Sequence, residues 1–374
     1  MLVMTSPYVE PVLGWYDAHA RDLPWRAPGV SPWPVLVSEV MLQQTPVSRV
    51  LPAYDSWLTR WPSPPALAAD PPGEAVRQWG RLGYPRRALR LHETATIVTR
   101  DHAGQLPSTR EALLALPGIG AYTAAAVAVF AFGKRHPVLD TNVRRVLSRL
   151  VTGQEFPGQQ PSTAEYGLAE SLLPAEAPTA ARWSVAVMEL GALTCTAARP
   201  KCAACPVANH CAWRANGSPP ADTRPAGQRY EGTDRQCRGR LLAILRDSTD
   251  PVPLARFDAI WPDTTQRARA LDGLVADGLV DPLPDGTFAL PALHTAPQST
   301  RTACGRFALP ALRAPAVHPP PDGRSALPSV TRRPQPAQPH RPRRPLRPPR
   351  VTAAPRPPSL TAPTDLIAPP NRYT

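Results

Sequence analysis

The stretch from Leu116 to Asp140 reads LPGIGAYTAAAVAVFAFGKRHPVLD and joins a glycine-rich turn to a helix of small residues and then to one acidic residue. The glycines of such a turn adopt backbone angles closed to other residues and keep side chains out of the way. The turn leads into a predicted helix N-terminus, where unpaired N–H groups and the helix dipole favour an anion. The stretch therefore predicts a phosphate-binding turn with the Asp140 carboxylate downstream. An ordinary turn between two helices is the alternative.

Apolar residues at helical spacing surround this stretch and predict an all-α fold. One short amphipathic pattern lies within residues 1–23. Helices are predicted before Asp140 at residues 34–42, 47–61, 74–82, 85–101 and 109–116, and after it at residues 142–150, 163–173 and 180–193.

The positive charge of the chain is concentrated at its C-terminal end. The formal net charge is +13, and residues 292–374 hold 13 arginines, no lysine and 2 aspartates. The remaining residues hold 29 basic and 27 acidic side chains. Overall basicity is therefore no argument that the folded part binds nucleic acid.

The C-terminal third is expected to contain a linker, a small module and a tail. Residues 219–227 are rich in proline and alanine and predict the linker. Three helical patterns at 238–246, 254–261 and 266–278, with two strands around an Asp285–Gly286 turn, resemble a winged-helix module over residues 228–291. Residues 292–374 contain 20 prolines and few aliphatic residues, which predicts a disordered tail.

Four of the six cysteines form a C-x6-C-x2-C-x5-C segment: Cys195, Cys202, Cys205 and Cys211. Four thiolates in so short a segment suit one tetrahedral zinc ion or one [4Fe–4S] cube, and the spacing alone leaves both open. The N-terminus lacks the features of a secretory signal, and no apolar run is long enough for a membrane span. We therefore expect a cytoplasmic protein.

The cysteine segment follows LPGIGAYTA (116–124) and VLDTNVRRVLSR (138–149), and together they resemble the helix-hairpin-helix DNA glycosylases of the endonuclease III superfamily. The resemblance implies a [4Fe–4S] cluster rather than zinc and Asp140 as the catalytic aspartate. It implies a DNA phosphate held by the N–H groups of Gly118, Ile119 and Gly120. It also implies a cleft between a six-helix barrel (24–135) and a cluster subdomain (1–23 and 136–217).

Four further segments resemble the MutY-type adenine DNA glycosylases: LPWR (23–26), SEVMLQQT (38–45), LGY (82–84) and MELGAL (188–193). The resemblance covers residues 8–215. It implies a bacterial, nucleoid-associated monomer that removes adenine mispaired with 8-oxoguanine or guanine from duplex DNA. Tyr122 stands where bifunctional relatives have a nucleophilic lysine, and neither Lys134 nor Lys201 replaces it. We therefore expect an abasic product with little strand cleavage.

The resemblance assigns a chemical role to four residues. Glu39 would be the general acid that protonates adenine, because desolvation in an apolar stretch raises the pKa of a carboxyl. Asp140 would stabilise the cationic sugar and form a transient bond to C1′, as in retaining glycosidases. Asn142 and Tyr122 would orient the water, the sugar and the carboxylates. The alternatives are a capping or exposed carboxylate for Glu39 and a helix N-cap for Asp140.

The resemblance also assigns residues to the flipped base and to the DNA. The adenine pocket is expected from Trp25, Arg26, Leu42 and Glu189, with plain core packing as the alternative for Trp25 and Leu42. Gln44 and Tyr84 are expected to wedge into the stack where the base leaves.

The region after the linker departs from the MutY type, whose members commonly carry a longer Nudix-related domain that reads 8-oxoguanine. How the opposite base is recognised is therefore left open. Two other functions also remain: a related glycosylase for mismatched thymine or oxidised pyrimidines, and a non-catalytic, cluster-containing DNA-binding regulator.

Overall fold

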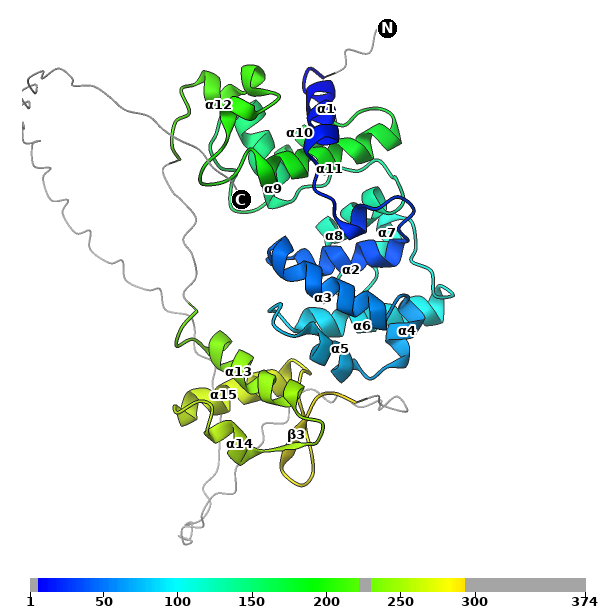
Figure 1. The fold of residues 1–374 in the computed structure, drawn as a ribbon, viewed down its shortest axis with the longest axis vertical. Coiled ribbons are helices and arrows are strands. Elements are labelled where there is room, and N and C mark those ends of the chain that lie inside the picture. The colour runs from blue at the N-terminus through cyan, green and yellow to red at the C-terminus, as the bar shows by residue number, and fades with distance from the viewer. Residues whose placement is uncertain (1–5, 222–229, 293–374) are drawn as a thin grey trace, which may run out of the picture. The chain divides into compact units, whose positions relative to one another are not determined.

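The computed structural model of the chain describes residues 6–221 and 230–292, and the described part is mostly helical (Figure 1). The predicted tail and most of the predicted linker lie outside these residues. None of the described helices is both long and apolar enough to cross a membrane.

A first hydrophobic core is built by residues between Leu23 and Ala128 and continues into the C-terminal region, between Cys237 and Val280. Its centre holds three indoles packed edge to face, with ring centroids 4.6 Å apart for Trp57 and Trp61 and 5.6 Å apart for Trp57 and Trp79. The elements around it are η1 (Pro24–Arg26), α2 (Pro32–Leu42), α3 (Val47–Arg60), α4 (Pro64–Ala69), α5 (Pro72–Trp79), α6 (Arg86–Asp101), α7 (Arg110–Leu114) and α8 (Ala121–Phe130).

Helix α4 lies in a region, residues 62–73, for which the sequence pattern predicts no helix. The segment Pro62-Ser63-Pro64-Pro65 reads as a loop, because proline is a strong helix breaker in a helix interior. At the first helical positions, however, the missing N–H has no partner to lose, and two prolines begin α4 there.

A second hydrophobic core joins the N-terminal helix to the residues after Leu139. Helix α1 packs on α11, and α11 packs on α9 (Figure 1). A Cβ at Gly191 of α11 would lie 2.7 Å from the Cβ of Asn142, so only glycine allows this approach. The elements are α1 (Val9–His19), α9 (Thr141–Leu147), the π-helical turn η2 (Ser148–Thr152), α10 (Thr163–Ser171), α11 (Ala177–Leu193), η3 (Cys202–Ala204), η4 (Ala208–His210) and α12 (Ala212–Ala215).

After the linker, residues 230–292 form three helices and a small antiparallel sheet of order β1-β3-β2. The three helices and the hairpin at Asp285–Gly286 lie where the sequence predicts them. Strand β1, which pairs Val252 with Phe288, was not predicted. The elements are α13 (Asp234–Asp247), β1 (Val252–Pro253), α14 (Leu254–Asp258), α15 (Thr264–Ala276), β2 (Asp281–Pro282) and β3 (Thr287–Ala289).

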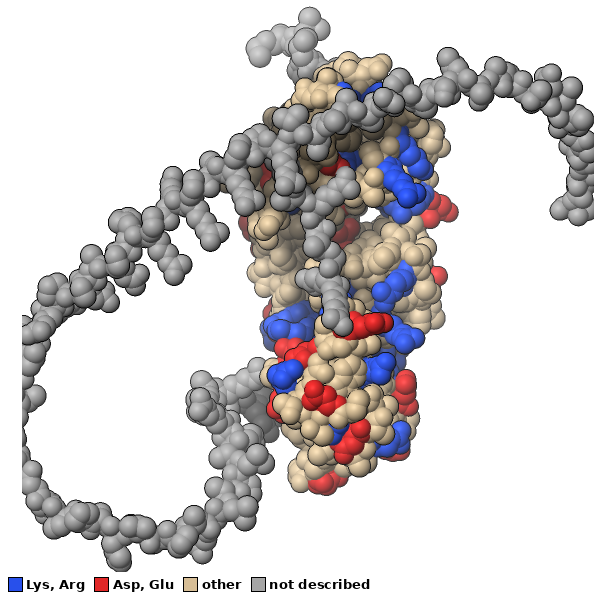
Figure 2. Space-filling view, turned by 90° about the vertical axis from the view of Figure 1, so that its left-hand side faces the viewer, with Lys and Arg blue, Asp and Glu red and all other residues tan. Residues whose placement is uncertain are grey.

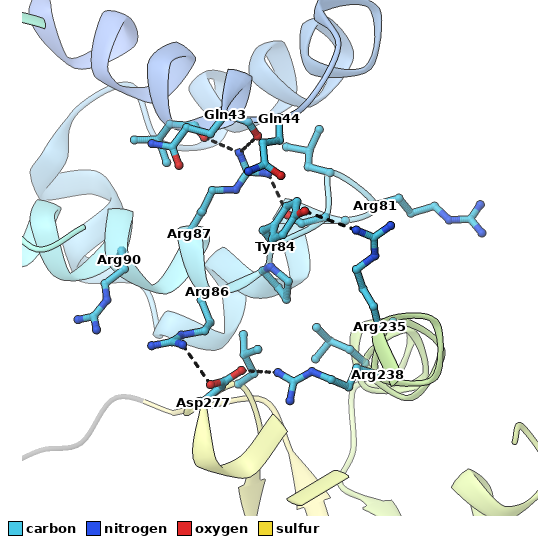
Figure 3. Close-up of a pocket in the computed structure, with 18 of the residues that line it drawn as sticks. Gln43, Gln44, Arg81, Tyr84, Arg86, Arg87, Arg90, Arg235, Arg238 and Asp277 are labelled. Atoms are coloured by element: carbon cyan, nitrogen blue, oxygen red, sulfur yellow. Dashed lines mark hydrogen bonds and ion pairs between the residues drawn. The ribbon is translucent and has the colours of Figure 1, made fainter. Parts of the chain in front are cut away.

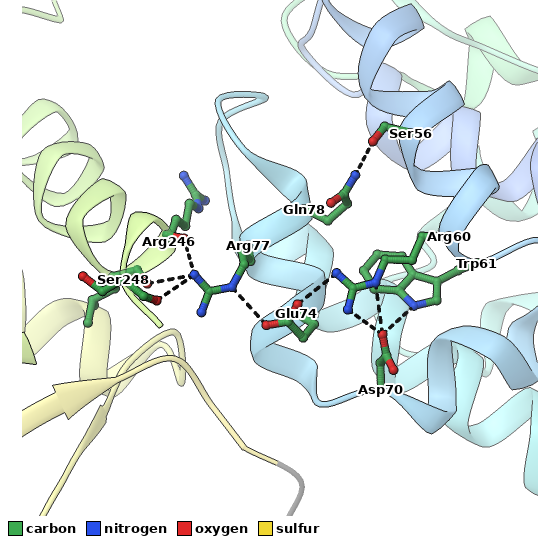
Figure 4. Close-up of polar contacts among 10 residues, drawn as sticks. Ser56, Arg60, Trp61, Asp70, Glu74, Arg77, Gln78, Arg246 and Ser248 are labelled. Carbon is green, nitrogen blue, oxygen red and sulfur yellow. Dashed lines mark hydrogen bonds and ion pairs between the residues drawn. The ribbon is translucent and has the colours of Figure 1, made fainter. Parts of the chain in front are cut away.

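Arg77 of α5 ties α13 to the part of the first core that precedes the linker (Figure 4). Its Nη1 donates to three carbonyls at the C-terminal end of α13: those of Ser248 (2.8 Å), Leu245 (3.4 Å) and Arg246. In return, Nε of Arg246 donates to the Val76 carbonyl at 2.9 Å. A cation is favoured at this end of a helix, where the carbonyls lack intrahelical donors. The contact therefore sets the position of α13 against α5.

Candidate active site

A cleft of about 980 Å³ is lined by residues of both hydrophobic cores. Side chains from α2, α8 and the start of α9 meet in it, together with η1. Seven of the residues predicted for catalysis and base binding line this cleft: Trp25, Arg26, Glu39, Leu42, Tyr122, Asp140 and Asn142.

Glu39 is a buried carboxyl on α2, 6% exposed, whose Oε2 accepts a hydrogen bond from the Tyr122 hydroxyl at 2.9 Å. Burial raises its pKa to about 7; the Tyr122 bond and the charge of Arg26 oppose this rise, and Asp140 adds to it. Near pH 7 the carboxyl is therefore both a proton donor and a proton acceptor. The apolar neighbourhood predicted from the sequence has the expected effect on its pKa.

Asp140 is the N-cap of α9, and both of its carboxylate oxygens are engaged. Oδ1 accepts the backbone N–H of Val143 at 2.6 Å, and Oδ2 accepts Nδ2 of Asn142 at 2.7 Å. Burial raises the pKa of Asp140, and these hydrogen bonds counteract the rise. The helix-cap interpretation is thus correct, and it does not compete with a chemical role because the cap holds the carboxylate in the cleft.

Arg145 holds Asn142 in place and was not singled out from the sequence. Its Nη2 donates to Asn142 Oδ1 at 2.9 Å and to the Gly191 carbonyl at 2.7 Å, while its Nε donates to the Cys195 carbonyl at 2.8 Å. The signal was present in VRRVLSR, where arginines interrupt an apolar helix. Since a buried guanidinium needs several acceptors, such residues commonly organise surrounding carbonyls.

Glu189 does not line the cleft, although the sequence placed it in the base pocket. Its carboxylate is fully buried and pairs with Arg21, at 2.7 Å, and with Arg26, at 3.0 Å. The hydrogen bond from Arg21 and the charge of Arg26 hold its pKa below the usual range against the opposing effect of burial. Arg21 and Arg26 do line the cleft, so Glu189 acts on it through them.

Gln44 and Tyr84 share an uncommon backbone conformation. Their φ angles are +55° and +47°, and among the described residues only Ala103 and Ser218 are other non-glycine positions with positive φ. Both side chains are exposed, Tyr84 by 45%. Non-glycine residues held in this region carry local strain, which is common at functional sites. The two predicted wedge residues are therefore distinguished by the backbone as well as by motif.

Arg87 joins the two turns that carry these residues (Figure 3). Its Nη1 donates to the carbonyls of Val40 (2.7 Å) and Gln43 (2.6 Å), at the end of α2, and its Nη2 donates to the Gly83 carbonyl (3.1 Å). Burial lowers the pKa of Arg87 to about 10. No sequence motif pointed to this residue, because two turns far apart in the chain meet only in the fold.

The glycine-rich turn leads into α8 as predicted. Gly118 has a φ of +73°, and a Cβ there would lie 2.7 Å from the Cβ of Arg90, so glycine is required twice over. The N–H of Ile119 donates to the Leu116 carbonyl at 3.2 Å and closes the turn. Gly118 and Ile119 line a second cavity rather than the cleft with Glu39.

The four-cysteine segment packs against the second core. Burial raises the pKa of the Cys205 thiol to about 11, and the charges of Cys195, Cys202 and Cys211 add to the rise. Nη1 of Arg149, a buried residue, lies 3.4 Å from Cys195 Sγ. Within the described residues, no group of three or more His, Cys, Asp or Glu side chains is arranged as a site for a single metal ion.

Comparisons with known proteins agree with this geometry. A family model described as HhH-GPD superfamily base excision DNA repair protein matches residues 37–170. The chain is 53% identical over 282 residues to the adenine DNA glycosylase of Mycobacterium tuberculosis, a match that covers 75% of this chain and 92% of that relative. The adenine DNA glycosylase of Mycolicibacterium smegmatis is also 53% identical, with 75% of this chain and 94% of that relative covered.

Among solved structures, a thermostable thymine-DNA glycosylase superposes with a TM-score of 0.51 at 30% identity, covering 56% of this chain and 95% of that one. The match to the mycobacterial relatives is longer. Three quarters of the chain is more than the part that precedes the linker, so this similarity extends into the region from α13 onward.

Proposed function

Because this chain belongs to the adenine DNA glycosylases of the HhH-GPD superfamily, we propose that it flips out adenine mispaired with 8-oxoguanine or guanine and hydrolyses its glycosidic bond. The activity itself, removal of adenine from DNA in base excision repair, follows from the family. The opposite base, the abasic product and the residue roles below are our proposals.

The single observation that carries the mechanism is the Glu39 carboxyl, buried beside Tyr122, with a pKa of about 7. Adenine is a poor leaving group until its ring is protonated. A carboxyl that still carries its proton near neutral pH can supply it, whereas an ordinary surface glutamate cannot. Glu39 donates this proton to a ring nitrogen of the flipped base as the bond to the sugar breaks.

Asp140 acts on the sugar that is left behind. Its carboxylate, held by Val143 N–H and Asn142, stabilises the positive charge at C1′ and forms a transient bond to that carbon. A water-derived hydroxyl then replaces it. Asn142, fixed by Arg145, and Tyr122 orient the reacting groups.

The adenine ring occupies the cleft beside Trp25, Arg26 and Leu42. Trp25 also packs edge-on against Tyr54, with 5.1 Å between ring centroids, so core packing and pocket lining coexist in this residue. Glu189 supports the pocket by positioning Arg21 and Arg26 through their ion pairs. Removing this buried carboxylate would leave uncompensated cations.

Gln44 and Tyr84 fill the space that the flipped base leaves in the duplex. The rest of the DNA lies on the side of these two residues that faces away from the cleft. Since the Ile119 N–H closes its own turn, we assign the phosphate contact to the amides of Gly118 and Gly120 and to the N-terminus of α8. Of the three residues expected from the sequence to bind the phosphate, the proposal therefore keeps the two glycines and omits Ile119.

Cys195, Cys202, Cys205 and Cys211 would hold a [4Fe–4S] cluster. The donor set fits: four thiols lie in one short segment, and three of them, Cys195, Cys205 and Cys211, pack against the second core. Arg145 and Arg149 contact Cys195, at its carbonyl (2.8 Å) and its Sγ (3.4 Å). These cations compensate the negative charge of a thiolate-bound cluster. When bound, the cluster would cross-link residues 195–211 beside α9, and the reaction steps above use protein groups alone.

The domain boundaries proposed from the sequence are retained. They are a barrel at 24–135, a cluster subdomain at 1–23 and 136–217, and a winged-helix-like module at 228–291. We propose a monomer acting on duplex DNA.

A duplex carrying one adenine opposite 8-oxoguanine tests the function. We expect purified protein to leave an alkali-labile site at the adenine, without a Schiff-base adduct on borohydride treatment, because Tyr122 replaces the lysine nucleophile. Duplexes with adenine opposite guanine and with thymine opposite guanine are the comparisons. Release of thymine instead of adenine would refute the proposal, and a borohydride-trapped adduct would refute the hydrolytic step.

The Tyr122→Phe variant tests whether the Tyr122 hydroxyl lowers the pKa of Glu39. The Tyr122 hydroxyl lowers the pKa of Glu39, so its loss should raise that pKa above about 7. A general acid works only while protonated, so the alkaline fall in adenine release should move to higher pH, even though the maximal rate decreases. Single-turnover rates between pH 6 and 9 measure the shift. An unchanged alkaline limb would show that another group controls it.

A further inference from the structure

Outside the cleft, a groove of about 1270 Å³ lies between α13 and the part of the first core that precedes the linker (Figure 3). It meets the cleft at Gln43 and Gln44, which line both. Tyr84 and the glycine-rich turn stand on the core wall of this groove, and Tyr230 and α13 form the other wall. The groove therefore begins where the two wedge residues separate it from the catalytic carboxylates.

Arginines dominate both walls of this space, which we call the arginine groove. The core wall contributes Arg49, Arg81, Arg86, Arg87 and Arg90. The α13 wall contributes Arg235, Arg238, Arg240 and Arg246.

The only acid among the described lining residues is Asp277, which is shared by Arg86, at 3.2 Å, and Arg238. On the face drawn in Figure 2, cationic and acidic side chains are interspersed. The sequence outside the tail is nearly balanced in charge as well. The arginine groove is thus a local concentration of positive charge rather than a consequence of overall basicity.

Besides Arg86 and Arg238, four of these arginines have polar partners within the protein. Arg90 pairs with Glu93 at 2.7 Å, and Arg49 donates to the Arg81 carbonyl. Arg87 binds the carbonyls of the wedge turns, and Arg246 binds Val76. Arg235 differs, because it is exposed and contacts two tyrosines. Its Nη1 lies 3.5 Å from the Tyr84 hydroxyl, and its guanidinium lies 5.1 Å from the ring centre of Tyr230. Within the described residues, no acid pairs with it.

The backbone position of Arg235 is set by the contacts of α13, and its side chain lies against Tyr84 and Tyr230. Helix α13 is attached to α5 by Arg77 at its far end, and Arg238 is attached to α6 through Asp277 and Arg86 (Figures 3 and 4). The guanidinium is therefore presented next to the wedge in advance of binding, which lowers the entropic cost of a contact there.

From this arrangement we propose that the arginine groove binds the sugar–phosphate backbone of the strand opposite the adenine, with Arg235 donating to a phosphate beside the unpaired base. The inference rests on the proposed function. The flipped adenine enters the cleft at Gln43 and Gln44, where cleft and groove meet, so we assign the glycine turn on the core wall to the adenine strand. The α13 wall then faces the second strand of the same duplex. Guanidinium groups bind phosphate oxygens through paired, charge-assisted hydrogen bonds.

The test measures binding to a duplex in which the mispaired adenosine carries a 2′-fluorine that resists base loss. Compared with the wild type, Arg235→Gln should bind about three- to tenfold more weakly at moderate salt, and Arg235→Glu more weakly still. The slope of log affinity against log salt should fall by about 1 for each lost phosphate contact. The control is Arg256→Gln, an exposed arginine of α14 outside the groove, which should bind as the wild type does.

Neutral methylphosphonate linkages identify the strand. Placed beside the unpaired base in the opposite strand, they should weaken the wild type and affect Arg235→Gln much less; in the adenine strand, they should weaken both equally. The proposal is overturned if Arg235→Gln binds the duplex as tightly as Arg256→Gln does. It is also overturned if methylphosphonates in the adenine strand, rather than in the opposite strand, weaken the wild type more than Arg235→Gln. Because the readout is binding, this failure is distinct from failure of the proposed function, which is wild-type protein that releases no adenine.

Discussion

Replacing Glu39 with glutamine should slow adenine release by about 10²- to 10⁴-fold or more, the range that general acid catalysis contributes. Glutamine keeps the length of the side chain and can still accept the 2.9 Å hydrogen bond of Tyr122, but it has no proton to donate. DNA binding should remain close to that of the wild type. Single-turnover release from the adenine–8-oxoguanine duplex measures the rate, and titration with the fluorinated duplex measures binding.

The pH dependence of adenine release by the wild type tests the same role of Glu39 independently. Wild-type adenine release should fall as pH rises through about 7, where Glu39 loses its proton. Stability follows the same titration. The folded pKa lies above the unfolded value of 4.5, so the folded state is progressively penalised between pH 4.5 and 7. At pH 8 the Glu39→Gln variant should therefore melt no lower than the wild type. A variant that melts well below it would mean that Glu39 is structural.

The second large effect is expected for Asp140→Asn, which should lower the rate at least about a hundredfold through loss of a negative charge beside C1′. Asparagine is as good an N-cap as aspartate, so α9 should persist with Val143 N–H still satisfied. One of the two donors now bound by Asp140 loses its acceptor, because an amide has a single oxygen.

Circular dichroism and thermal melting separate the two roles of Asp140. The expected variant is folded, close to the wild type in stability and almost inactive. Asp140→Ala is the contrasting substitution, because it removes cap and charge together and should lose about 1 kcal/mol of stability as well. Product formation by Asp140→Asn at the wild-type rate would contradict the proposed role of Asp140, and no product from the wild type would favour the non-catalytic alternative.

The sequence was sufficient to identify the candidate site residues that belong to short motifs. Glu39, Tyr122, Asp140 and Asn142 all belong to such motifs, and all four line one cleft. Helix patterns were equally readable, since most helices here bury a continuous apolar stripe. Helix α4 was missed because proline is ambiguous: it breaks a helix interior and favours a helix start. The four-residue helix α12 was also not predicted.

The tertiary structure was needed for residues that act through partners distant in sequence. Glu189 belongs to an apolar motif that resembles the family, but only the fold shows that Arg21 and Arg26 surround it and keep it out of the cleft. Arg87 and Arg145 likewise bind carbonyls from several segments, and no local pattern predicts such a set of acceptors.

For this protein, then, the sequence alone led to the proposed reaction, through an acid in an apolar stretch, a second carboxylate, and a tyrosine where relatives have a lysine nucleophile. The tertiary structure decided which groups surround the groove proposed to bind DNA. It placed the glycine turn, the strained Gln44 and Tyr84, and Arg235 around one groove. The physical reason is that proton transfer depends on the identity of a side chain and its immediate burial. Recognition of an extended, charged ligand depends instead on many groups whose distances are set only by packing.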